Sequence, residues 1–105
     1  MISEQSLIDI NKNGYSHRHR PEMLKYIPES ATKILEVGCN DGAFCATLKR
    51  PDREIWGVEM NEIAAQKATN ICTFVLVGDF NSIFDQLPKN HFDCYKLINQ
   101  IVFLN

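Results

Sequence analysis

The sequence lacks a long hydrophobic run. No apolar segment approaches the roughly 18 residues that a membrane-spanning helix needs, and the first residues lack the basic-then-apolar pattern of a signal peptide. Excess positive charge is also missing, since 11 Lys and Arg against 13 Asp and Glu give a net charge of −2. We therefore expect a cytoplasmic protein with no membrane partner, and the acidic balance disfavours nucleic acid as a partner.

The cysteine spacing of a metal site or a redox motif is absent too. The four cysteines form no C-x-x-C pair, and three of them lie among apolar residues. We predict reduced core thiols and no metal site. The three histidines, isolated in polar surroundings, are interpreted as surface residues rather than as catalytic bases: His17, His19 and His91.

What is present is an alternation of strand and helix patterns in 105 residues, enough for one domain. The expected strands cover 34–37, 54–59, 73–77 and 92–98, and the expected helices cover 43–49, 61–68 and, as a short one, 82–87. This order predicts an α/β fold: an open, mainly parallel four-stranded sheet with right-handed crossovers and helices on both faces. Residues 99–105 are too few to classify.

The first strand leads into a loop bracketed by Gly38 and Gly42. Asn40 stands between them and is the non-glycine residue that best tolerates a positive φ. A strand, a glycine-bracketed loop and a helix together are typical of a site for an anionic or nucleoside cofactor. A dinucleotide fingerprint would need glycines at the first, third and sixth positions of the loop, where this chain has Gly38, Asn40 and Ala43. The spacing therefore argues against a nicotinamide-dependent enzyme.

Three of the expected strands end in acidic or glycine-containing segments: Glu36-x-Gly38, Glu59 and Gly78-Asp79. Ligands of parallel sheets lie beyond the carboxyl ends of the strands. Glu59 follows Gly42 at close to the roughly 20-residue offset at which an acidic side chain meets ribose hydroxyls. The alternative, that Glu59 is only a solvated strand end, stays open at this point.

The motif acidic-x-Gly-x-(Gly)-x-Gly, with Glu36, Gly38 and Gly42, resembles the first motif of class I S-adenosylmethionine-dependent methyltransferases. Asn40 departs from the glycine usual there. The resemblance extends from Lys33 to the neighbourhood of Asn99 and implies a Rossmann-like sheet with strand order 3-2-1-4. It implies S-adenosylmethionine as cofactor and S-adenosylhomocysteine as product.

The resemblance also implies a role for each site residue. The loop of Glu36, Gly38, Cys39, Asn40 and Gly42 would cradle the methionine part, with Glu36 ordering the loop rather than acting as a catalytic acid. Glu59 would take the ribose diol and Met60 would pack on adenine. Asp79 would accept a hydrogen bond from the adenine amino group, and Phe80 would lie near the adenine ring. Asn99 would border the sulfonium.

Residues 1–32 are interpreted as an N-terminal helical flap and 33–105 as a cofactor-binding core that is truncated after the fourth strand. Tyr15 and Arg20 would close over the cofactor or belong to a solvated basic loop.

Catalytic residues and the methyl acceptor are not identified. The predicted function is the cofactor-binding half of a methyltransferase; the alternative is a non-catalytic nucleoside-cofactor-binding or assembly module. The fourth strand would form an exposed sheet edge with Tyr95, Leu97 and Ile98, which predicts a homo-oligomer.

Overall fold

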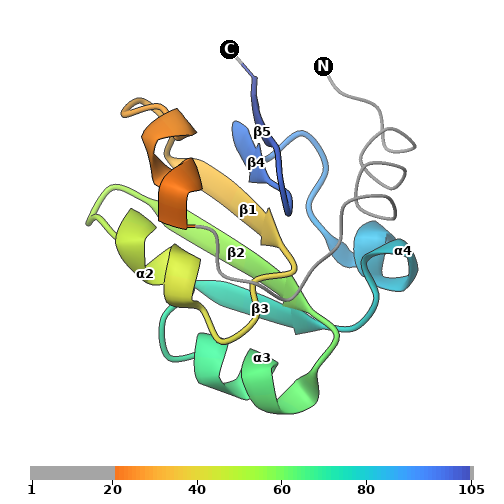
Figure 1. Cartoon of the computed structure of the whole chain (residues 1–105). Helices are drawn as coiled ribbons and strands as arrows, with labels where there is room; N and C mark the ends of the chain where they lie inside the picture. The colour runs from red at the N-terminus through yellow and green to blue at the C-terminus, as the bar shows by residue number, and fades with distance from the viewer. Residues whose placement is uncertain (1–20, 105) are drawn as a thin grey trace.

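A computed structural model of the chain describes residues 21–104 (Figure 1). The elements follow one another as 3-10 helix η1 (Pro21–Tyr26), β1 (Lys33–Val37), α2 (Ala43–Leu48), β2 (Glu54–Glu59), α3 (Glu62–Ala68), β3 (Phe74–Val77), α4 (Phe80–Ile83), 3-10 helix η2 (Phe84–Gln86), β4 (Cys94–Lys96) and β5 (Ile101–Phe103).

The strands form one sheet in the order β3-β2-β1-β4-β5. The first four strands pair in parallel, with Ile34 opposite Ile55 and Cys94, and Trp56 opposite Phe74. The predicted α/β class, the parallel pairing and the order 3-2-1-4 of these strands are confirmed.

The prediction of four strands was wrong, because the chain turns back after β4 and adds β5 antiparallel to it. The Leu97 N–H donates to the Gln100 carbonyl across this turn at 2.8 Å. The prediction that β4 is an exposed edge was wrong for the same reason. Leu97 and Ile98 are buried, and Tyr95 is half-buried and pairs with Val102.

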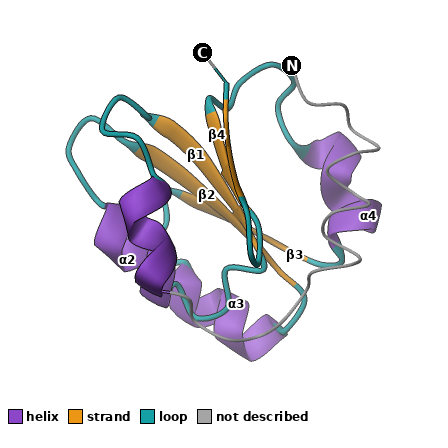
Figure 2. Cartoon of the chain, turned by 45° about the horizontal axis from the view of Figure 1, so that its top comes forward, coloured by secondary structure: helices purple, strands orange, loops and turns teal. Residues whose placement is uncertain are grey.

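Helices cover both faces of the sheet, as predicted. Figure 2 shows α2 and α3 on one side and α4 on the other. Alternation along β1 explains this arrangement, since successive side chains of a strand point to opposite faces. Ile34 joins the core under α2, whereas Leu35 and Val37 join the core under α4. The α2 side also buries Phe44, Cys45, Leu48, Ile55 and Ala68, and the α4 side buries Val58, Phe80, Ile83, Leu87 and Phe92.

Phe74 lies on the edge strand β3 and is 49% exposed. Its ring packs against that of Trp56, which is half-buried, at a centroid distance of 4.5 Å. An edge strand has a neighbour on one side only, so part of its apolar side chains stays open to solvent.

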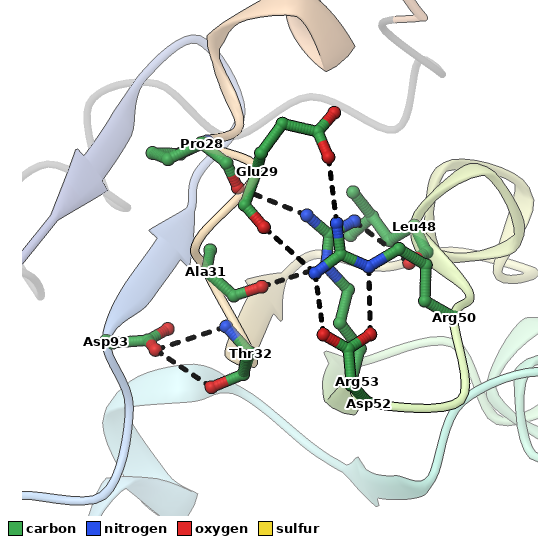
Figure 3. Close-up of polar contacts among 9 residues, drawn as sticks. All are labelled: Pro28, Glu29, Ala31, Thr32, Leu48, Arg50, Asp52, Arg53 and Asp93. Carbon is green, nitrogen blue, oxygen red and sulfur yellow. Dashed lines mark hydrogen bonds and ion pairs between the residues drawn. The ribbon is translucent and has the colours of Figure 1, made fainter.

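The segment before β1 is fastened to the domain by polar contacts (Figure 3). The Arg53 guanidinium donates to the carbonyls of Pro28, Ala31 and Leu48 at 2.9–3.1 Å. Asp93, the residue just before β4, accepts hydrogen bonds from the N–H and the hydroxyl of Thr32. Just ahead, η1 buries Met23 against the α2 side of the core. Residues 1–20 of the predicted flap, with Tyr15 and Arg20, lie outside the described residues.

All four cysteines are free thiols and are buried, which confirms the prediction of core thiols. Between residues 21 and 104, no three His, Cys, Asp or Glu side chains gather in a way that could hold a metal ion. The same part of the chain has no helix with the length and apolar character needed to cross a membrane.

Candidate functional site

The loop after β1 has the backbone that its residues predict. Gly38, Asn40 and Gly42 have φ values of 76°, 52° and 91°, so Asn40 adopts the positive φ that asparagine tolerates best among non-glycine residues. The N–H groups of Gly38 and Cys39 both donate to the Val58 carbonyl, at 2.8 and 3.0 Å. The loop is thereby held against the end of β2.

Substitutions at Asn40 test whether cofactor binding requires a residue that tolerates positive φ at this position. We expect Asn40→Gly to keep cofactor affinity and Asn40→Val to lose it, because a β-branched residue is strained at positive φ by roughly 1–2 kcal/mol. Calorimetric titration of both variants with S-adenosylhomocysteine measures the effect. Equal affinity of the wild type and the two variants would show that the loop backbone does not matter for binding.

Glu59 ends β2 as a buried carboxylate, only 1% exposed. One oxygen accepts from the N–H of Asn40 at 2.8 Å, and the other accepts from the N–H of Asn61 at 2.9 Å. Asn61 in turn caps α3 through the N–H of Ala64. Glu59 therefore joins the glycine loop to the start of α3, and it is not a solvated strand end.

An open pocket of about 430 Å³ lies beside Glu59. It is lined in part by Asn40 and Asn61, the two residues whose N–H groups donate to this carboxylate. Its remaining wall consists of Asp41, Ile63, Ala64 and Lys67. A pocket of this volume falls in the range of small-molecule sites.

The other predicted site residues lie at the carboxyl ends of their strands, with different exposure. Met60 is 47% exposed beside Glu59, and Asp79 is exposed in front of α4. The Gly78 N–H donates to the Glu59 carbonyl at 2.8 Å, which brings the ends of β2 and β3 together. Asn99 is exposed in the turn between β4 and β5. Phe80 is buried against Phe84 in the core under α4, so its ring is not open at this edge.

The side chain of Glu36, a residue of β1, lies on the α2 side of the sheet rather than in the loop. One carboxylate oxygen lies 3.6 Å from the Lys96 ammonium, and the other accepts from the Cys45 thiol at 3.0 Å. The Lys96 ammonium also lies 4.9 Å from the centre of the Phe44 ring. This buried pair connects β1, α2 and β4 and was missed at the sequence level. The signal that could have found it is a lysine in the otherwise apolar run Cys94 to Ile98.

Burial raises the pKa of Glu36 from 4.5 to about 7, outweighing the Cys45 hydrogen bond and the charge of Lys96. Between pH 4.5 and about pH 7, the Glu36 carboxyl group is protonated in the folded protein and ionised in the unfolded chain. The resulting stabilisation is complete below pH 4.5 and is lost as the pH rises through 7. The free energy of unfolding of the wild type should therefore fall by on the order of 3 kcal/mol between pH 4.5 and pH 7. Glu36→Gln has no carboxyl group at this position and should lack this decrease. Urea denaturation of both proteins at several pH values measures it, and parallel pH profiles would contradict it.

The fold is that of known methyltransferases, as comparison with solved structures shows. A TehB-like SAM-dependent methyltransferase from Corynebacterium glutamicum superposes with a TM-score of 0.55 at 20% identity, over 87% of this chain and 50% of that one. A SAM-dependent methyltransferase from Archaeoglobus fulgidus gives 0.61 at 23% identity, over 89% and 42%. The N-terminal domain of EvdMO1 with SAH bound gives 0.58 at 20% identity, over 90% and 53%.

These three comparisons establish the Rossmann-like fold of class I S-adenosylmethionine-dependent methyltransferases, which the sequence resemblance implied. The chain spans only about half the length of these solved structures or less. No protein-family model matches the sequence, and no curated protein matches it.

Proposed function

We propose that the chain binds S-adenosylmethionine and S-adenosylhomocysteine as the cofactor-binding part of a methyltransferase. The observation that carries this proposal is Glu59, a buried carboxylate between the glycine loop and α3 at the carboxyl end of a methyltransferase-like sheet. Glu59 would accept hydrogen bonds from the ribose hydroxyls once the cofactor displaces the groups that now bury its carboxylate.

The neighbouring residues fit the rest of the cofactor. Exposed Met60 offers an apolar side chain to adenine, and exposed Asp79 offers an acceptor to its amino group. The positive φ of Gly38 and Asn40 lets the backbone approach the methionine part closely. The cofactor supplies an activated methyl group, and the chain orients it and excludes water.

The proposal also divides the chain into an N-terminal part, residues 1–32, and a cofactor-binding core, residues 33–105, and it places the protein in the cytoplasm. The methyl acceptor stays open. The alternative is a module that keeps the sheet for cofactor binding or assembly without methyl transfer.

Isothermal titration with S-adenosylhomocysteine and, separately, with NAD tests the proposed function. We expect binding of the first ligand and none of the second. Binding of NAD alone would contradict the proposal in favour of a nicotinamide enzyme. Binding of neither ligand would contradict it in favour of the assembly module.

Oligomerisation through a sheet edge stays a prediction. Of the two edge strands, β3 and β5, we assign it to β3, which has the more exposed side chains. Phe74 and Val77 of β3 are 49% and 48% exposed, and apolar edge strands tend to pair with another chain. We expect a dimer or larger species in light scattering and a shift to monomer in Phe74→Lys. Leu24→Lys, at an exposed leucine of η1, is the control and should leave the assembly unchanged. A monomeric wild type at high concentration would contradict the prediction.

A further inference from the structure

Three of the four buried cysteines come together beneath the glycine loop. They come from distant segments: Cys39 from the loop itself, Cys45 from α2, and Cys72 from the turn before β3. All three belong to the core on the α2 side of the sheet. Cys94 belongs to the same core but to β4, on the other side of β1.

Gly57 makes room for two of these sulfur atoms. A Cβ atom at this position of β2 would stand 2.6 Å from the Sγ of Cys39 and 3.4 Å from the Sγ of Cys72. The two sulfur atoms therefore occupy the space above Gly57 where a side chain would be. A glycine inside a strand weakens the strand and commonly marks such a close approach.

Cys72 is the thiol of this group most suited to react first. It is 7% exposed, against 2% for Cys39 and 0% for Cys45. Contact with the Cys39 side chain, with a smaller contribution from the charge of Lys49, lowers the pKa of Cys72 below that of a free thiol. Contact with Cys72 and burial raise the pKa of Cys39 and of Cys45. The thiolate is the form of cysteine that attacks an oxidant.

We propose that a hydroperoxide converts Cys72 and Cys39 into a reversible disulfide, and that this bond weakens cofactor binding. In the first step the Cys72 thiolate attacks the hydroperoxide with uptake of a proton, giving a sulfenic acid and an alcohol, or water from hydrogen peroxide. In the second step the Cys39 sulfur attacks the sulfenic sulfur and water leaves. The two sulfur atoms lose two electrons in total, and the hydroperoxide gains them.

The effect on binding follows from the position of Cys39, and this part rests on the proposed function. Cys39 stands between Gly38 and Asn40, which both have positive φ. Drawing its sulfur to the roughly 2.05 Å of a disulfide bond shifts the loop. The Asn40 N–H then moves relative to Glu59, to which it donates at 2.8 Å. We expect the affinity for S-adenosylhomocysteine to fall at least about tenfold, a typical result of straining such a loop.

The test treats the full chain with hydrogen peroxide and maps the peptides without reduction. We expect a Cys39–Cys72 linked peptide and weaker binding of S-adenosylhomocysteine, both reversed by dithiothreitol. Cys72→Ser should form no linked peptide, and peroxide should not change its affinity. Cys39→Ser should likewise form no linked peptide. Cys94→Ser is the matched control, a buried cysteine outside the group, and should behave as the wild type.

Each other result overturns the proposal. A Cys45–Cys72 linkage, or oxidation of Cys72 without a linkage, would show that the second step is wrong. A linked peptide with unchanged affinity would refute the regulatory part. If the reduced protein binds no S-adenosylhomocysteine, the proposed function fails, and peptide mapping of the wild type still decides whether the disulfide forms.

Discussion

Replacing Glu59 by alanine should weaken binding of S-adenosylhomocysteine about 10–100-fold, because charge-assisted hydrogen bonds to the ribose hydroxyls are lost. The same change should lower the free energy of unfolding by about 2–5 kcal/mol. It removes the carboxylate partner of the Asn40 and Asn61 N–H groups, and each hydrogen bond to a charged group contributes roughly 1.5–3 kcal/mol. Calorimetric titration measures the first effect and urea denaturation the second.

Two further variants separate binding from folding. Glu59→Gln keeps one acceptor oxygen but presents an amide NH₂ to one of the two N–H donors, so we expect intermediate losses in both measurements. Glu62→Ala removes an exposed carboxylate from the first turn of α3 and should leave affinity unchanged. If Glu59→Gln folds stably and binds as tightly as the wild type, Glu59 does not contact the cofactor.

Replacing Lys96 by methionine should lower the free energy of unfolding by about 3–5 kcal/mol at pH 8, since it leaves Glu36 buried without its ammonium partner. At pH 6 the loss should be smaller. The pKa of Glu36 is about 7 already in the presence of Lys96, and without this charge the carboxyl group takes up a proton more readily. Urea denaturation at both pH values measures the difference.

The double variant Glu36→Gln with Lys96→Met removes both charges and should be more stable than Lys96→Met alone, because no uncompensated charge stays buried. Lys89→Met serves as the control. Lys89 lies on the surface with 63% of its side chain exposed, so its loss should change stability by no more than about 0.5 kcal/mol. A Lys96→Met variant that is as stable as the wild type at pH 8 would mean that the pair carries no net attraction.

The contacts that the sequence did not reveal are all between segments far apart in the chain. Lys96 meets Glu36 because β4 pairs with β1, and the Cys39 and Cys72 sulfur atoms meet because both pack over Gly57. The resemblance implied that Phe80 lies near adenine, yet Phe80 is buried against Phe84 at the start of α4. Residues 99–105 show no strand pattern by themselves. They contain β5 because the returning chain pairs antiparallel with the otherwise free edge of β4.

The sequence by itself determined the features that depend on neighbouring residues. An apolar run followed by Gly38, Asn40 and Gly42 predicted the strand and the positive φ values of the loop, because local sterics set both. The alternation of strands and helices predicted the parallel sheet and its covered faces. Only the tertiary structure decided that Glu59 is a buried carboxylate bound to two N–H groups, and that Glu36 pairs with Lys96. Burial and partner choice depend on which distant segments pack together, and no pattern within a few residues encodes that.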